Sequence, residues 1–192
     1  MEEELLMITD APYTLNFMIY IQNIYLNQHH NLESYKHPLL SSQVYFNENF
    51  VSAYKDLWNE MIEQLSNPQC NDMEIFYVEK DLFYERLFEM NTKSSKIYTE
   101  IYNTFEVWWN SLAGRFAVER FPEAALHSLY IELVQLLTQS DVKIQRHLKI
   151  NLIYEECLLA RKEVSPYFAV LPLNNFFANY RDLALKLKSC FY

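Results

Sequence analysis

Apolar residues recur at helical spacing along most of this chain of 192 residues. Stripes of apolar positions three or four residues apart are typical of helices that turn one face towards a core. Such stripes lie within residues 13–30, 50–65, 76–90, 97–112, 126–137, 148–159 and 177–187. Short strand-like runs stand only at 44–46 and 168–171. The pattern therefore predicts about seven helices and very little sheet.

Helix breakers support this division of the chain. Six prolines stand at positions 12, 38, 68, 122, 166 and 172, and the stretches between them are long. Pro122 suits the first turn of a helix, and Asn71 with Glu74 has the spacing of a capping box. We find no internal repeat and no linker between domains. We predict an all-α, single-domain bundle over residues 1–192, with connections rich in proline and asparagine.

Glycine is almost absent, since Gly114 is the only one in the chain. Phosphate-binding loops and nucleophile elbows need several glycines, so the P-loop, the dinucleotide fingerprint, the kinase glycine loop and the hydrolase elbow are excluded. The sixteen asparagines can serve the turns, because asparagine is the next best residue for left-handed backbone.

The amino-acid composition is typical of a folded protein in a reducing compartment. Aromatic residues make up 16% of the sequence, which excludes disorder over most of its length. The three cysteines are widely spaced and odd in number, so we expect the cytoplasm. Gln22 and Asn23 interrupt the most apolar early run, and the acidic start lacks the basic region of a signal peptide. We therefore predict no membrane span.

Charge is distributed unevenly along the chain. The formal net charge is −9, with acidic residues dominating up to residue 140 and basic residues in excess after it. An acidic body disfavours duplex nucleic acid as a partner, because its carboxylates repel the phosphates. Lys143, Arg146 and Lys149 recur every third residue. They predict a patch for an acidic partner or for a second copy of the chain, and the alternative is a solvated helix face.

One histidine pattern has the spacing of metal ligands. His29, Glu33 and His37 stand four residues apart and would share one face if the segment were helical. The surrounding residues are polar and Pro38 follows, so a solvated loop or helix end is the alternative that we favour. We predict no cofactor.

Arg120 and His127 form the second candidate for catalysis. Six residues separate them, a spacing that resembles the Arg…His pattern of HEPN-type ribonucleases. The resemblance implies that the arginine stabilises charge on the scissile phosphate and that the histidine aids proton transfer. The chain departs from that family in two ways. Phe121 stands where the family has a polar residue, and Pro122 should place Arg120 outside the helix of His127.

Aromatic residues exceed what one helix face needs around Trp108 and Trp109, and again at Phe176 and Phe177. Core burial is the first explanation, and an aromatic partner surface that includes Trp109 is the second. We therefore expect a non-enzymatic acidic protein that binds another protein or itself, as a regulator, inhibitor or immunity-type partner. The alternatives are a bundle that binds a small apolar ligand, and an enzyme using the histidine patterns described above.

Overall fold

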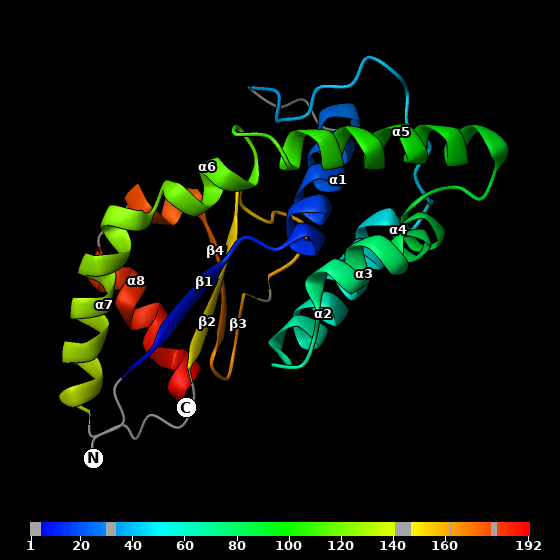
Figure 1. Ribbon diagram of the computed structural model, residues 1–192. Helices are drawn as coiled ribbons and strands as arrows, with labels where there is room; N and C mark the ends of the chain where they lie inside the picture. Colours follow the sequence, from blue (N-terminus) through cyan, green and yellow to red (C-terminus); the bar gives the residue numbers. More distant parts are fainter. Residues whose placement is uncertain (1–4, 30–33, 141–146, 162, 178–179) are drawn as a thin grey trace. The chain divides into compact units, whose positions relative to one another are not determined.

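The computed structural model in Figure 1 describes the chain except for residues 1–4, 30–33, 141–146, 162 and 178–179. Two compact units are each assembled from separate stretches of sequence. Unit 1 contains Met1–Pro12, Leu112–Glu156 and Glu163–Tyr192, and unit 2 contains Tyr13–Ser111 and Cys157–Lys162. The described residues are mostly helical, as predicted. The all-α prediction is wrong, because unit 1 contains a four-stranded sheet.

The regular elements described in unit 2 are all helices. Its helices are α1 (Tyr13–His29), α2 (Phe50–Ser66), α3 (Asp72–Val78), α4 (Lys80–Leu87) and α5 (Thr92–Trp109). Helix α1 carries no Asp, Glu, Lys or Arg, and almost all of its side chains from Tyr13 to Leu26 are buried. A helix that is buried on all sides belongs in the centre of its unit. The predicted helix at 13–30 is confirmed.

Asparagine residues begin three of these helices. Asn49, Asn71 and Asn91 occupy the N-cap positions of α2, α3 and α5. The side chain of Asn71 accepts a hydrogen bond from the Met73 N–H, which satisfies one of the unpaired amides at a helix start. The single helix expected from 71 to 90 is two helices, because the chain turns at Glu79 between α3 and α4.

Unit 1 contains a mixed sheet of order β1-β2-β4-β3. Its strands are β1 (Met7–Asp10), β2 (Leu148–Ile153), β3 (Val164–Ser165) and β4 (Phe168–Pro172). Strands β1, β2 and β4 run parallel, whereas β3 runs antiparallel to β4. Its helices are α6 (Arg115–Arg120), α7 (Glu123–Thr138), η1 (Leu173–Phe177), α8 (Tyr180–Lys188) and η2 (Ser189–Phe191).

Strand β2 replaces the helix that the sequence analysis expected around residues 148–159. Leu148, Ile150, Leu152 and Ile153 are all buried, so both faces of the strand are covered. A central strand of a parallel sheet is a continuous run of apolar residues. The spacing of apolar residues alone does not distinguish such a run from a buried helix. The strand expected at 168–171 is confirmed as β4.

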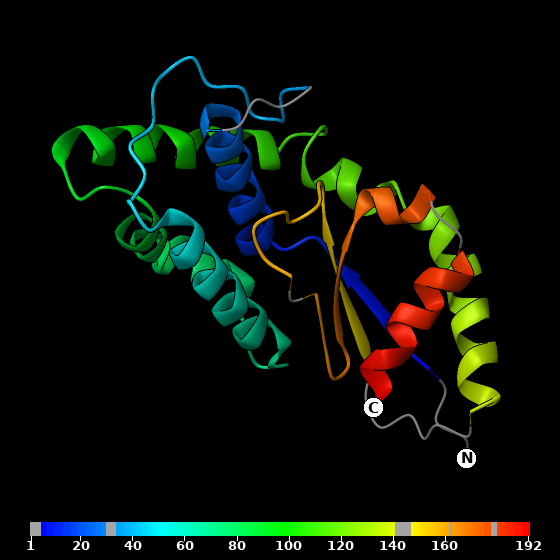
Figure 2. The ribbon, with the colours of Figure 1, turned by 180° about the vertical axis from the view of Figure 1, so that it is seen from behind.

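Helices α7 and α8 lie side by side in both views of the molecule (Figures 1 and 2). Leu129, Leu133 and Leu137 are buried on α7, and Leu183 and Leu187 are buried on α8. The spacing of four residues within each set places it on one helix face. The predicted helix at 126–137 is confirmed, with Pro122 as its N-cap.

The hairpin between β3 and β4 turns at Pro166 and Tyr167. Tyr167 has a φ of 58°, in the left-handed region that glycine usually occupies. Its backbone N–H donates to the Cys190 carbonyl at 2.8 Å, and its ring lies 5.2 Å from that of Phe191. These contacts with η2 hold a conformation that a non-glycine residue adopts only at some cost.

None of the helices in the described part of the chain is long and apolar enough to cross a membrane.

Candidate functional site

A pocket of about 440 Å³ lies at the carboxyl end of β1, within unit 1. It is lined by Thr9, Leu126 and five charged side chains. The charged residues are Asp10, Arg115, Glu119, Arg120 and Glu123. The carboxyl ends of parallel strands are the usual place for ligands in open sheets. Strand β1 and helices α6 and α7 thus bring together residues from the start and the middle of the sequence.

Arg115 links β1 to α6. Its Nη2 lies 3.1 Å from Asp10 Oδ1, and its Nε donates to Glu119 Oε1 at 2.7 Å. All three side chains are about one-third exposed. Since Asp10 ends the strand and Glu119 is one turn along α6, this arginine joins the end of β1 to α6 beside the pocket.

Arg120 is held more loosely at the rim. Its Nη1 lies 2.8 Å from Glu123 Oε2, with the two side chains 62% and 66% exposed. The hydrogen bond to Glu123 and the negative charge of that carboxylate raise the pKa of the Arg120 guanidinium. The same guanidinium lies 5.7 Å from the centre of the Phe116 ring, within cation–π range. One cation thus contacts both a carboxylate and an aromatic face.

Three phenylalanines of unit 1 are well exposed: Phe116 on α6, Phe121 at the C-cap of that helix, and Phe177 at the end of η1. Phe116 is 52% exposed, Phe121 is 47% exposed and Phe177 is 78% exposed. The rings of Phe121 and Phe177 meet edge to face with centroids 5.2 Å apart. Helix α6 places Phe116 one turn before Arg120, and η1 ends at Phe177. We call Phe116, Phe121 and Phe177 the phenyl patch.

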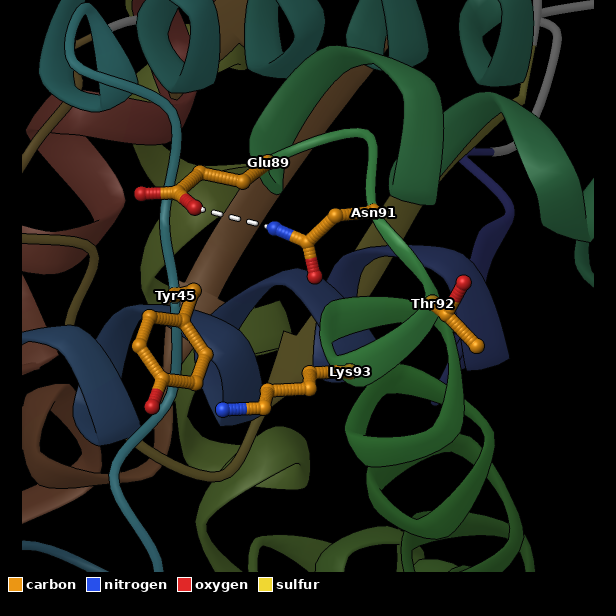
Figure 3. Close-up of a pocket in the computed structure, with 5 residues that line it drawn as sticks. All are labelled: Tyr45, Glu89, Asn91, Thr92 and Lys93. Carbon is orange, nitrogen blue, oxygen red and sulfur yellow. Dashed lines mark hydrogen bonds between the residues drawn. The ribbon is translucent and has the colours of Figure 1, made fainter.

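A second pocket, of about 310 Å³, lies in unit 2 where α5 begins (Figure 3). Tyr45, Glu89, Asn91, Thr92 and Lys93 line it. Asn91 donates to Glu89 Oε2 at 3.0 Å and accepts from the Ser94 N–H at 2.9 Å. Because these groups cap α5 and fix the segment before it, we take the pocket at β1 as the candidate site.

The two residues of the ribonuclease-like pattern lie on different helices. Arg120 ends α6, whereas His127 is an exposed residue of α7 and is not among the residues that line the pocket. Pro122 is the N-cap of α7, so the separation expected from this proline is confirmed. The guanidinium of Arg120 is paired with Glu123.

The histidines of the metal pattern have separate surroundings. His29 Nδ1 lies 3.0 Å from the Tyr25 carbonyl, and its ring stacks on that of Tyr25. The ring of His37 lies 4.7 Å from that of Trp108. Glu33 lies outside the described residues. In the part of the chain that the structure describes, no group of three His, Cys, Asp or Glu residues could hold a metal ion.

The predicted partner-binding residues do not form one described surface. Lys149 lies in β2, so the helical spacing expected to align it with Lys143 and Arg146 is wrong at this position, and those two lie outside the described residues. Trp109 is fully buried and stacks on Phe105 at 5.6 Å. Trp109 therefore belongs to the core, which is the first of the two explanations given for the excess of aromatic residues.

Sequence reasoning singled out Arg120 and Phe177 but missed Asp10, Arg115 and Phe116. The pair Arg115–Glu119 has i,i+4 spacing, as have Phe116 and Arg120, and such pairs can be recognised in a sequence once a helix is assumed. Asp10 has no such signal, because it reaches Arg115 across 105 residues of chain.

Comparisons of this chain with protein-family models, with curated proteins and with solved structures find no match. Its function is therefore argued from the pocket and the phenyl patch.

Proposed function

We propose that this protein binds another protein through the phenyl patch and acts as a regulator, inhibitor or immunity-type partner without catalysing a reaction. The observation that carries the proposal is the exposure of the Phe121–Phe177 ring pair, with Phe116 also exposed on α6, the helix that Phe121 caps. Large apolar groups gathered on a surface mark interaction sites. Aromatic and arginine side chains are enriched where protein interfaces derive most of their binding energy.

A polypeptide suits this surface better than the other ligand classes considered. The adjoining pocket is lined mainly by charged groups, which disfavours a small apolar ligand. Asp10, Glu119 and Glu123 would repel the phosphates of a nucleic acid. The proposal keeps the cytoplasm as the compartment, which the widely spaced cysteines favour.

Selection of peptides from a random displayed library tests this proposal. The immobilised wild-type protein is the bait, and the affinity of the enriched peptides is then measured against Phe121→Ala and Phe177→Ala. Tyr192→Ala is the matched control, because Tyr192 is an exposed aromatic residue of unit 1 outside the patch. We expect both patch variants to weaken binding about tenfold or more, as truncated interface anchors do. The control should bind like the wild type.

Two results would overturn the proposal. One is a selection that enriches no peptide, and the other is a set of peptides that bind the patch variants and the wild type equally. Sedimentation of the free protein gives a further outcome. A dimer that dissociates in Phe177→Ala would assign the patch to a second copy of the chain in place of a different protein.

A further inference from the structure

The rim of the pocket shows which charge the partner should bring to the phenyl patch. Arg120 places one guanidinium against both the Phe116 ring and the Glu123 carboxylate. An aromatic face beside a carboxylate is a favourable surrounding for a cation. The molecule thus already holds a cation, from its own chain, between the Phe116 ring and a carboxylate that lines the pocket.

The balance of charge around this point is negative. Three carboxylates and two guanidiniums line the pocket, and the whole chain has a net charge of −9. Arg115 makes ion pairs with carboxylates from two different elements, β1 and α6. Arg120 pairs with Glu123 alone among the ion pairs described, and that pair is well exposed. Ion pairs this exposed are among the weakest, so a competing cation can replace Arg120 at small cost.

We propose that the partner carries a lysine or arginine next to the apolar side chain that covers the phenyl patch, and that this cation displaces Arg120 from Glu123 and Phe116. The inference rests on the proposed function, because the same polypeptide covers the patch. In the free protein, Arg120 then occupies the position that the partner's lysine or arginine takes in the complex. Its removal should favour binding, whereas the removal of the Glu123 charge should oppose it.

Two substitutions at the rim test the sign of this effect. The probe is the tightest peptide from the library selection, and its affinity is measured by titration calorimetry. We expect Arg120→Gln to bind the peptide about two- to fivefold more tightly, and Glu123→Gln to bind it about five- to tenfold more weakly. Replacement of the peptide's lysine or arginine by glutamine should remove both effects.

Matched variants control for changes of charge elsewhere. Glu132→Gln makes the same change on α7 outside the pocket, and Arg86→Gln removes a guanidinium from the exposed ion pair with Glu60 in unit 2. Both should bind the peptide like the wild type. Because all four side chains are at least partly exposed, loss of folding is not expected, and a urea unfolding curve for each variant verifies this.

Ionic strength supplies a second measurement. Binding to the wild type should weaken as salt rises from about 50 to about 300 mM, because the pairing of exposed charges is screened. The dependence should be shallower in Glu123→Gln. An affinity that does not respond to salt would contradict the inference.

Failure of the inference can be told from failure of the proposed function. If peptides depend on Phe121 and Phe177 but Arg120→Gln weakens their binding, or if neither rim variant changes it, the function stands and the basic partner is overturned. If the peptides that depend on the patch contain Asp or Glu in place of Lys or Arg, the result is the same. If no peptide depends on the patch, both proposals are wrong.

Discussion

Two sets of phenylalanine rings, one in each compact unit, differ sharply in their exposure to solvent. In unit 2, Phe17, Phe76 and Phe105 are fully buried, and their rings pack within 5.6 Å of one another. In unit 1, Phe121 and Phe177 also pack ring against ring but remain about half or more exposed. The abundance of aromatic residues therefore has two explanations in one chain. The first set forms a core, and the second set remains in contact with solvent.

The polar side chains of α1 in unit 2 and those that line the pocket of unit 1 also differ in burial and charge. Helix α1 of unit 2 buries Gln22 and Asn23, whose amides bond to backbone groups of neighbouring segments. Asn27 similarly bonds to the backbone of Lys36 and Pro38. These uncharged groups hold loops in place. The pocket of unit 1 is lined by charges that remain in contact with solvent, and this difference is why we place function there.

The largest expected effect contrasts two phenylalanines. Phe17→Ala should lower the free energy of unfolding by about 3–5 kcal/mol, because it leaves a cavity among several rings. Phe177→Ala should change it by no more than about 0.5 kcal/mol, because the ring is mostly in water. Urea unfolding followed by circular dichroism measures both. Equal losses would remove the distinction between core and surface rings.

Gln22 tests the structural role of the buried amides. Its Oε1 accepts hydrogen bonds from the backbone N–H groups of Leu158 and Leu159, at 2.7 and 3.1 Å. Gln22→Leu should cost about 1–3 kcal/mol of stability, because two partly buried backbone N–H groups lose their acceptor. Gln135→Leu, at an exposed position of α7, is the matched control. A Gln22 variant as stable as this control would contradict the role that we give to these amides.

Substitutions of Tyr167, which has a left-handed backbone conformation, should change stability by an intermediate amount. Tyr167→Gly and Tyr167→Ala both remove the ring that contacts Phe191, but only glycine adopts a φ of 58° without steric cost. We expect the glycine variant to be more stable than the alanine variant by about 1 kcal/mol. Thermal unfolding of the two proteins measures the difference, and no difference would mean that the turn relaxes.

High pH should affect the buried core of unit 2. Burial raises the pKa of Tyr20 to about 12, and burial also raises the pKa values of Tyr98 and Tyr102. Above pH 10 the unfolded chain loses these protons more readily than the folded chain. The stability that these residues contribute is therefore complete below pH 10 and is lost as the pH rises towards 12.

Absorbance of the phenolate group, followed together with circular dichroism, measures this alkaline transition. We expect a fraction of the tyrosines to ionise only as helical structure is lost. Ionisation of every tyrosine near pH 10 with the helices intact would show that these rings are not protected.

Helices were more predictable from the sequence than strands. The apolar stripe of α7 and the uncharged run of α1 each identify a helix by length and period. Strand β1 has only four residues, none of them fully buried, and β2 has six residues whose apolar character comes from burial in a parallel sheet. Nothing within the sequence near residues 7–10 shows that residues 148–153 lie beside them. The single-domain organisation remains a prediction.

The candidate site was only partly accessible to sequence reasoning. Arg120 and Phe177 were singled out, the first as a catalytic residue and the second as one of a pair of aromatics. The structure separates that pair, since Phe176 is buried and Phe177 is exposed. The contact between Asp10 and Arg115 is tertiary and depends on the sheet. The ribonuclease and metal alternatives remain hypotheses, which assays of RNA cleavage with His127→Ala and of metal content would test.

The most direct test of partner binding by the phenyl patch is the affinity of one selected peptide for the wild type and for Phe177→Ala, measured beside the stability of each protein. We expect the variant to unfold at the same urea concentration as the wild type and to bind the peptide about tenfold or more weakly. Equal affinities at equal stability would contradict the claim that unit 1 exposes these rings for a partner.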